Sequence, residues 1–241
     1  MDLRRKDIHN SDVPALCRAC ESRHRGVCGV LTPSQLVRLS KNSVLHSAPA
    51  GKELSGETLK SKSYSNIIRG VVKLSKLLAD GRQQIVGLQF APDFLGRPFR
   101  KDNRVTAEAA TDVDLCSFPT SVVDAMIRET PELEHQLYEQ SLNELDEARD
   151  WMLTLGRKSA SEKIASYLLL IATHADPERD ASSAEFDLPM SRVDIADFLG
   201  LTVETVSRQF TKLRKDGVIT IRNNRHVLVP DLQRLDERAA R

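Results

Sequence analysis

Near its C-terminus the chain carries two short amphipathic segments separated by one glycine, and this arrangement restricts the fold more than any other feature. The first segment begins at Ser191, a residue type that caps helices, with Asp194 three positions later. Gly200 ends that helix in a tight turn, and a second helix is expected over 202–215. Two helices joined by a short turn containing glycine form a helix-turn-helix.

The second helix separates its polar and apolar side chains. Its apolar residues, expected to pack inward, are Val203, Val206, Phe210 and Leu213. Glu204, Ser207 and Arg208 then point outward on one ridge, where arginine can bind guanine and glutamate can accept from cytosine. The alternative is that Glu204 and Arg208 form an i,i+4 pair that only stabilises the helix.

Behind this helix, two apolar runs flank Arg222-Asn-Asn-Arg225, which predicts a β-hairpin and hence a winged helix. Residues 204–225 hold six basic and two acidic side chains, a modest positive footprint for a phosphate backbone. The candidates for backbone contacts are Thr202, Thr211, Lys212, Arg222 and Arg225.

Three of the four cysteines lie within twelve residues, as Cys17, Cys20 and Cys28, whereas Cys116 stands far along the chain. The C-x2-C spacing lets two thiolates meet at one metal, and the polar surroundings favour a loop over a packed helix. Four neighbours are expected to favour thiolates: Arg18, Arg23, His24 and Arg25. Unrelated cysteines and a zinc site stay open, while the three-plus-one arrangement slightly favours an iron–sulfur cluster.

Between these two regions the sequence pattern changes twice. A short helix is expected over 31–42, and short alternating runs with turn signals such as Asp80-Gly81 then predict a β-roll to about residue 119. A helical pattern follows over 120–156, interrupted near Pro131. Its candidates for a dimer interface are Leu137, Leu142, Leu145 and Met152.

Charge and composition exclude several classes of protein. No apolar run reaches the roughly 18 residues of a membrane helix, and no apolar export signal follows the first residues, so a cytoplasmic, reducing location is expected. Neither a catalytic Ser/His/Asp pattern nor a phosphate-binding glycine loop occurs, so we do not expect an enzyme. The net charge of +1 is the sum of +7 in residues 1–119, −7 in residues 120–151 and +1 in residues 152–241. The negative charge of residues 120–151 would oppose close pairing of two dimer helices.

These motifs together resemble the cyclic-AMP receptor/FNR superfamily of bacterial transcription regulators. The stretch from Ser191 to Arg208, with Glu204-x-x-Ser207-Arg208, is similar to the helix-turn-helix of the oxygen-responsive FNR type, in particular its alphaproteobacterial FnrN/FnrL branch. The resemblance implies an α+β fold: an N-terminal β-roll like a cyclic-nucleotide-binding domain, a long dimerisation helix and a C-terminal winged helix-turn-helix. The implied segments are 1–30 for the cluster, 31–119 for the roll, 120–156 for the helix and 157–241 for DNA binding.

The same resemblance implies the chemistry. It assigns a [4Fe–4S] cluster to Cys17, Cys20, Cys28 and Cys116 rather than zinc, and base reading in TTGAT-like half-sites to Glu204, Ser207 and Arg208. In relatives that bind cyclic AMP, glycine–glutamate and arginine–serine elements hold the nucleotide. Here the corresponding stretches are 95–98 (Leu-Gly-Arg-Pro) and 104–106 (Arg-Val-Thr), so no nucleotide is expected.

The resulting hypothesis is an oxygen-sensing regulator, mainly an activator, of anaerobic or microaerobic genes. An intact cluster at low oxygen would promote a homodimer that binds a palindromic double-stranded DNA site and contacts RNA polymerase. The alternative is a regulator of the same fold gated by a nucleotide, haem or nitric oxide, with incidental or zinc-binding cysteines.

Overall fold

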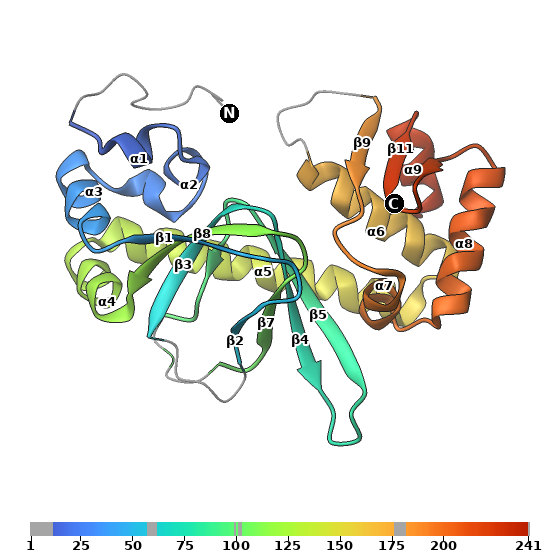
Figure 1. Cartoon of the computed structure of the whole chain (residues 1–241), viewed down its shortest axis with the longest axis horizontal. Helices are drawn as coiled ribbons and strands as arrows, with labels where there is room; N and C mark the ends of the chain where they lie inside the picture. Colours follow the sequence, from blue (N-terminus) through green and yellow to red (C-terminus); the bar gives the residue numbers. More distant parts are fainter. Residues whose placement is uncertain (1–11, 57–61, 99, 101–102, 176–181, 241) are drawn as a thin grey trace. The chain divides into compact units, whose positions relative to one another are not determined.

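The computed structural model describes most of the chain. Figure 1 shows its helices and strands, coloured along the sequence from the N-terminus to the C-terminus. The described residues are 12–56, 62–98, 100, 103–175 and 182–240. The predicted cluster segment 1–30 therefore lies partly outside them, in residues 1–11. Among the described residues, no helix is both long enough and apolar enough to cross a membrane.

Contacts divide the chain into two compact units. The first takes the residues up to Leu78 together with Val86–Leu145, and the second takes Ala79–Ile85 together with the residues from Asp146 onward. The division falls inside one long helix, α5 (Pro131–Arg157). The four segments expected from the sequence are a finer division, and they stay a prediction.

The first unit begins with short helical turns. They are α1 (Ala15–Arg18), α2 (Glu21–His24) and the 3-10 helix η1 (Val27–Val30), followed by α3 (Pro33–Ser40). The expected helix over 31–42 is thus confirmed, because Thr32 accepts from the Gln35 backbone N–H and Pro33 opens the first turn. The expectation of a loop around the cysteines is wrong, since one-turn helices hold most of that segment.

Two four-stranded sheets form the β-roll of this unit. One contains, in order, β1 (Val44–Ala48), β8 (Val113–Pro119), β3 (Ser63–Arg69) and β6 (Phe94–Leu95). The other contains β2 (Glu53–Ser55), β7 (Thr106–Ala109), β4 (Val71–Leu77) and β5 (Gln83–Phe90). Ile67 and Leu115 from the first sheet pack against Val72 and Ala107 from the second, so alternating strand residues build the core between them.

A second core joins the cysteine segment to the helices that follow the roll. After α4 (Thr120–Glu129), the chain enters α5 at Pro131. Val27 and Cys28 pack in one cluster with Phe118, Met126 and Leu137. Leu137 is only 6% exposed there, so its assignment to a dimer interface is wrong: it holds α5 on its own unit.

The second unit confirms the winged helix. It contains α6 (Ala160–Ala175), α7 (Arg192–Leu199) and α8 (Val203–Lys215), and a sheet in the order β10 (Thr220–Arg222), β11 (His226–Val229), β9 (Ala184–Asp187). The third strand, β9, and the last helix, α9 (Leu232–Arg238), do not follow from the sequence patterns above. Helix α9 packs on α6.

Candidate DNA-reading face and cysteine centre

Local hydrogen bonds set the geometry of the helix-turn-helix. The Ser191 hydroxyl accepts from the Asp194 N–H (3.1 Å) while the Asp194 carboxylate accepts from the Ser191 N–H (3.2 Å), a reciprocal cap that starts α7. Gly200 ends it in the left-handed region at φ 60°, where a side chain would be strained. Thr202 then caps α8 by accepting from the Thr205 N–H (3.2 Å).

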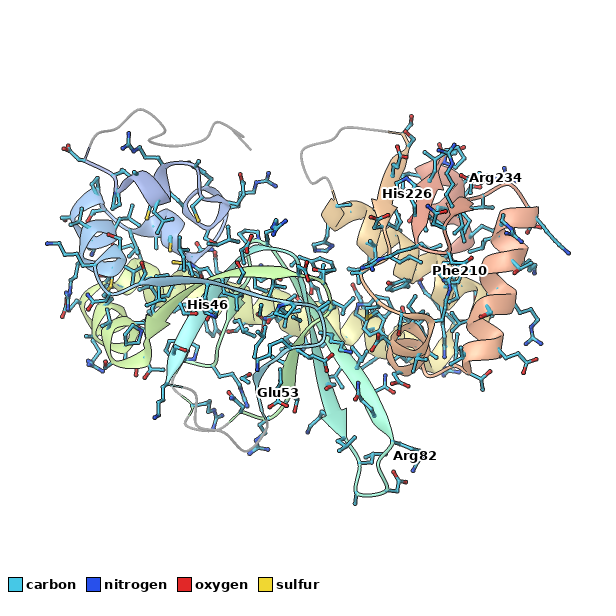
Figure 2. All side chains as sticks on the ribbon, in the orientation of Figure 1. His46, Glu53, Arg82, Phe210, His226 and Arg234 are labelled. Atoms are coloured by element: carbon cyan, nitrogen blue, oxygen red, sulfur yellow. The ribbon has the colours of Figure 1, made fainter. Side chains whose placement is uncertain are left out.

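The inner face of α8 is buried against the rest of the unit. Val206, Phe210 and Leu213 are each at most 2% exposed, as expected, and the Arg192 guanidinium lies 3.4 Å from the centre of the Phe210 ring. Figure 2 marks Phe210 on this helix. Val203, which was expected to pack inward, is 41% exposed because it lies in the first turn of α8, beyond the reach of this core.

The outer face of α8 presents the predicted base-reading residues. Glu204, Ser207 and Arg208 are all exposed on its N-terminal half. Within the part of the chain that the structure describes, Glu204 and Arg208 make no ion pair with each other, so their charges are available to a ligand. This half of the helix is the part that enters the major groove in helix-turn-helix proteins.

The residues predicted to contact the DNA backbone differ in their exposure and in their hydrogen bonds within the protein. Lys212 and Arg222 are exposed. The hydroxyl of Thr202 caps α8, and that of Thr211 donates to the Ser207 carbonyl at 3.0 Å. Arg225 is exposed at the wing, but its Nε donates to the Leu188 carbonyl at 3.0 Å. All five lie on α8, at its N-cap or in the wing. Three of them, Thr202, Thr211 and Arg225, also make hydrogen bonds within the protein.

The wing has a tight two-residue turn. Asn223 and Asn224 both lie in the left-handed region, at φ 51° and 56°, which matches the type I′ turn of a short hairpin. On the other side β11 pairs with β9, where the His226 imidazole lies between two carboxylates. Its Nδ1 is 2.8 Å from Asp187 and its Nε2 is 2.7 Å from Glu185. Since a carboxylate only accepts, both nitrogens donate when the ring is protonated, and these hydrogen bonds raise the pKa of His226.

We therefore expect a pH-dependent contribution of His226 to stability. Its raised folded pKa means that the contribution is complete below the unfolded value of about 6.5 and is lost as the pH rises through the folded value. Urea unfolding of the parent and His226→Gln should thus differ more at about pH 6 than at about pH 8.5. A His226→Gln difference independent of pH would contradict the expectation.

The fold brings all four cysteines to one pocket. Cys17 and Cys20 are partly exposed, whereas Cys28 and Cys116 are buried and 8% exposed each. They line the same small cavity, together with apolar side chains of Leu36, Ile68 and Phe118. Cys116 reaches it from β8, so the grouping depends on the roll and not on local spacing.

The N-terminal turns pack closely against the roll. A Cβ atom at Gly26 would lie 3.0 Å from the Pro92 carbonyl oxygen and from the Ser22 Cα, closer than most real contacts, so a side chain there would require these backbone atoms to shift. Arg23 is 5% exposed, lines the same cavity and donates from Nη1 to the Gly29 carbonyl at 2.8 Å. A buried guanidinium beside four sulfur atoms suits a centre that carries negative charge.

The expectation that basic neighbours favour thiolates is wrong for this conformation. Burial raises the pKa of Cys28 to about 12 and that of Cys116 to about 11. The pKa of Cys17 is also raised, by burial and then by Cys20, and the Arg23 charge lowers it only in part. Desolvation therefore outweighs the nearby charge at Cys17, Cys28 and Cys116.

Four cysteine thiols are the donor set of both structural zinc sites and iron–sulfur clusters. In the described part of the chain, no group of three or more His, Cys, Asp or Glu side chains is placed to hold one ion. The cavity between the thiols is about 20 Å³. A cluster is larger than this cavity, so its binding would require the lining residues to move apart.

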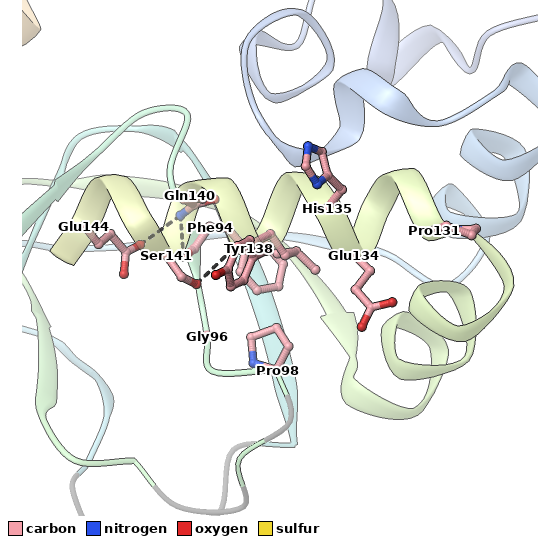
Figure 3. Close-up of a pocket in the computed structure, with 11 residues that line it drawn as sticks. Phe94, Gly96, Pro98, Pro131, Glu134, His135, Tyr138, Gln140, Ser141 and Glu144 are labelled. Carbon is pink, nitrogen blue, oxygen red and sulfur yellow. Dashed lines mark hydrogen bonds between the residues drawn. The ribbon is translucent and has the colours of Figure 1, made fainter. Parts of the chain in front are cut away.

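Two larger cavities of the first unit lack cysteines. A groove of about 440 Å³ runs along the start of α5, where Gln140 donates to Glu144 at 3.0 Å (Figure 3). A second, of about 280 Å³ inside the roll, is lined by Leu95, Gly96, Arg97 and Glu144.

Comparisons with known proteins decide the family. Residues 162–238 match the model of the Crp-like helix-turn-helix domain. The chain is 56% identical over 236 residues to a probable transcriptional activator of Rhizobium leguminosarum bv. viciae, covering 98% of both proteins. It is 40% identical over 239 residues to the transcriptional activator protein FnrL of Cereibacter sphaeroides, covering 95% of this chain and 94% of FnrL. The chain belongs to the Crp/FNR family.

A solved structure of this family supports the fold. FixK2 from Bradyrhizobium japonicum matches with a TM-score of 0.73 and 32% identity, over 81% of this chain and 96% of that one. The expected α+β architecture of roll, long helix and winged helix is thereby confirmed. As a Crp/FNR protein, the chain is a transcription regulator whose DNA-binding element is the helix-turn-helix of α7 and α8.

Proposed function

We propose that this Crp/FNR protein is an oxygen-responsive transcriptional activator of the FNR type. The observation that carries the proposal is the convergence of Cys17, Cys20, Cys28 and Cys116 on one pocket. Its relatives include proteins named as transcriptional activators, which supports activation through RNA polymerase. The proposed site is a TTGAT-type palindrome read by Glu204, Ser207 and Arg208.

A homodimer is part of this proposal. Residues 141–150 of α5 are exposed on every side of the helix, and a helix of this kind gains little stability from propensity alone. Exposed apolar side chains recur at steps of seven along it, at Tyr138 (61%), Leu145 (44%) and Met152 (72%), with Leu142 (42%) between them. This spacing is that of a helix that pairs with a second copy.

The cysteine pocket offers a way to control that pairing. When all four cysteines bind one group, the turns from Ala15 to Val30 are fixed to β8 and to the core that holds Leu137 at the start of α5. Release of the group removes this link and leaves only packing and hydrogen bonds between these turns and the roll. Nine acidic and two basic residues between 120 and 151 then oppose association of two helices.

A [4Fe–4S] cluster bound there would supply the sensitivity to oxygen. Cys17, Cys20, Cys28 and Cys116 would hold it, and Arg23 would balance part of its charge. The apolar lining of the pocket would limit access of water.

The test compares protein prepared without oxygen with the same protein after exposure to air. Iron and acid-labile sulfide, oligomeric state and affinity for a TTGAT palindrome are measured on each sample. We expect about four iron atoms per chain, a dimer and tight binding before exposure, and loss of all three afterwards. A scrambled palindrome is the control, and equal affinity before and after air would refute the oxygen response.

One observation favours a second candidate, a regulator of the same family that works without a cluster. The pocket between the thiols is only about 20 Å³. Anaerobic protein that contains no iron yet binds the palindrome as a dimer would support this candidate. The signal would then be a nucleotide, haem or nitric oxide, and the cysteines would be incidental or bind zinc.

A further inference from the structure

One buried polar residue of the cysteine pocket plays no part in the function described so far. Asn66 lies in the middle of β3, is 1% exposed and lines the pocket with the four cysteines. In the strand register it stands directly opposite Cys116 of β8. The sequence alone does not single it out, because nothing in the run Ser-Tyr-Ser-Asn-Ile-Ile marks the position of one polar residue relative to distant thiols.

The side chain of Asn66 connects the two segments that supply the cysteines. Its Nδ2 donates to the Cys28 sulfur at 3.2 Å, within hydrogen-bond distance for sulfur. Cys28 belongs to η1 in the N-terminal turns, whereas Asn66 pairs through its backbone with the strand of Cys116. One amide therefore joins Cys28 to the strand pair that carries the fourth cysteine.

The other end of the amide shows that packing alone does not explain this residue. The Asn66 Oδ1 is buried and has no hydrogen-bond partner among the described residues. Burying an amide with one unsatisfied atom is unfavourable, and a leucine of similar size would fill an apolar pocket better. An asparagine at this position is therefore best explained by what its N–H group does for the sulfur.

We propose that Asn66 is a positioning residue of the cysteine centre, which seats Cys28 and slows the loss of the group that the four cysteines bind. The inference rests on the proposed function for the identity of that group. An N–H group directed at a metal-bound sulfur stabilises its negative charge and holds the ligand in place. Loss of this donor should weaken the centre without removing a ligand.

The experiment uses the full chain with Asn66→Leu, which keeps the volume, and Asn66→Asp, which keeps the shape but removes the donor. Ser65→Ala is the matched control: Ser65 is the preceding strand residue, is also buried, and shares its hydroxyl contact with Ser117 (2.6 Å) on the other face. Unfolding in urea first confirms that each variant folds. If one Asn66 variant fails to fold, the other carries the test.

The first measurement is the decay of the iron–sulfur absorbance in air after anaerobic loading. We expect both Asn66 variants to load iron and then to lose it about tenfold faster than the parent, while Ser65→Ala decays at the parent rate. The second is the maleimide labelling rate of Cys28 in reduced, iron-free protein, read by mass spectrometry. Cys28 is 8% exposed, and its labelling should become about tenfold faster when the link to β3 is lost.

The outcomes separate this inference from the proposed function. If the parent protein takes up no iron, the cluster proposal fails, and the labelling rate alone decides the role of Asn66. Faster labelling of Cys28 would then support the positioning role. Unchanged labelling would overturn it, as would an iron-loaded Asn66 variant that decays at the rate of Ser65→Ala.

Discussion

Alanine in place of Arg208 is expected to weaken binding to a TTGAT-type palindrome by about 1–3 kcal/mol per half-site, or about 5- to 150-fold. Arg208 is exposed on the N-terminal half of α8 and has no ion-pair partner among the described residues, so its two-pronged donor can reach guanine O6 and N7. Removal of a buried base contact leaves those acceptors unsatisfied, which makes the loss specific to the sequence. Gel shifts on the palindrome and on variants at the guanine position measure it.

Lys212→Ala provides the matched control for this prediction. Lys212 is exposed one turn further along α8, where we expect it to face phosphate and not base edges. Its loss should weaken binding to all sequences by a similar factor and reduce the dependence on salt. A uniform loss with Arg208→Ala, unchanged when the guanine is replaced, would show that Arg208 contacts only the backbone.

Replacing Cys116 by serine should abolish iron binding. Cys116 is the only one of the four cysteines that lies outside the N-terminal turns, so its sulfur links those turns to β8. A serine hydroxyl is a far poorer ligand for iron than a thiolate. Iron per chain should fall from about four to below about one, and binding to the palindrome without oxygen should fall to the level of the air-exposed protein.

The neighbouring strand residue supplies the control for this substitution. Ser117 is 9% exposed and hydrogen-bonds to Ser65, away from the thiols. Ser117→Ala should therefore keep its iron and its DNA binding. Full iron content in Cys116→Ser would exclude Cys116 as a ligand and favour the regulator that works without a cluster.

The DNA-reading face could be predicted in detail because its geometry depends on neighbours in sequence. Ser191 with Asp194 and Thr202 with Thr205 are helix caps within three residues, and Gly200 has the positive φ that a short turn needs. The orientation of the exposed ridge follows from the helical repeat once the buried residues are known. The exposed Val203 shows the limit of this reasoning, because a repeat cannot say where the core beneath the helix ends.

The sequence predicted that a β-roll and a long helix would form, but it did not predict which of their residues pack against each other. Leu137 has the spacing of a dimer residue, yet it is buried beside Cys28 and Phe118. Leu142, Leu145 and Met152 share that spacing and remain exposed. The difference depends on how far the core of the first unit extends along α5, and the periodicity of one helix contains no information on that point.

By itself, the sequence determined the helix-turn-helix, the wing and the presence of four thiols, since each rests on contacts within a few residues. Only the tertiary structure decided that Cys116 meets the N-terminal cysteines and that Asn66 faces Cys28. The physical reason is the register of β3 and β8, which sets Asn66 opposite Cys116 and depends on pairing between segments far apart in the chain. The same burial that brings these thiols together raises the pKa of Cys28 and Cys116. The sequence had predicted the opposite, that basic neighbours favour the thiolate form.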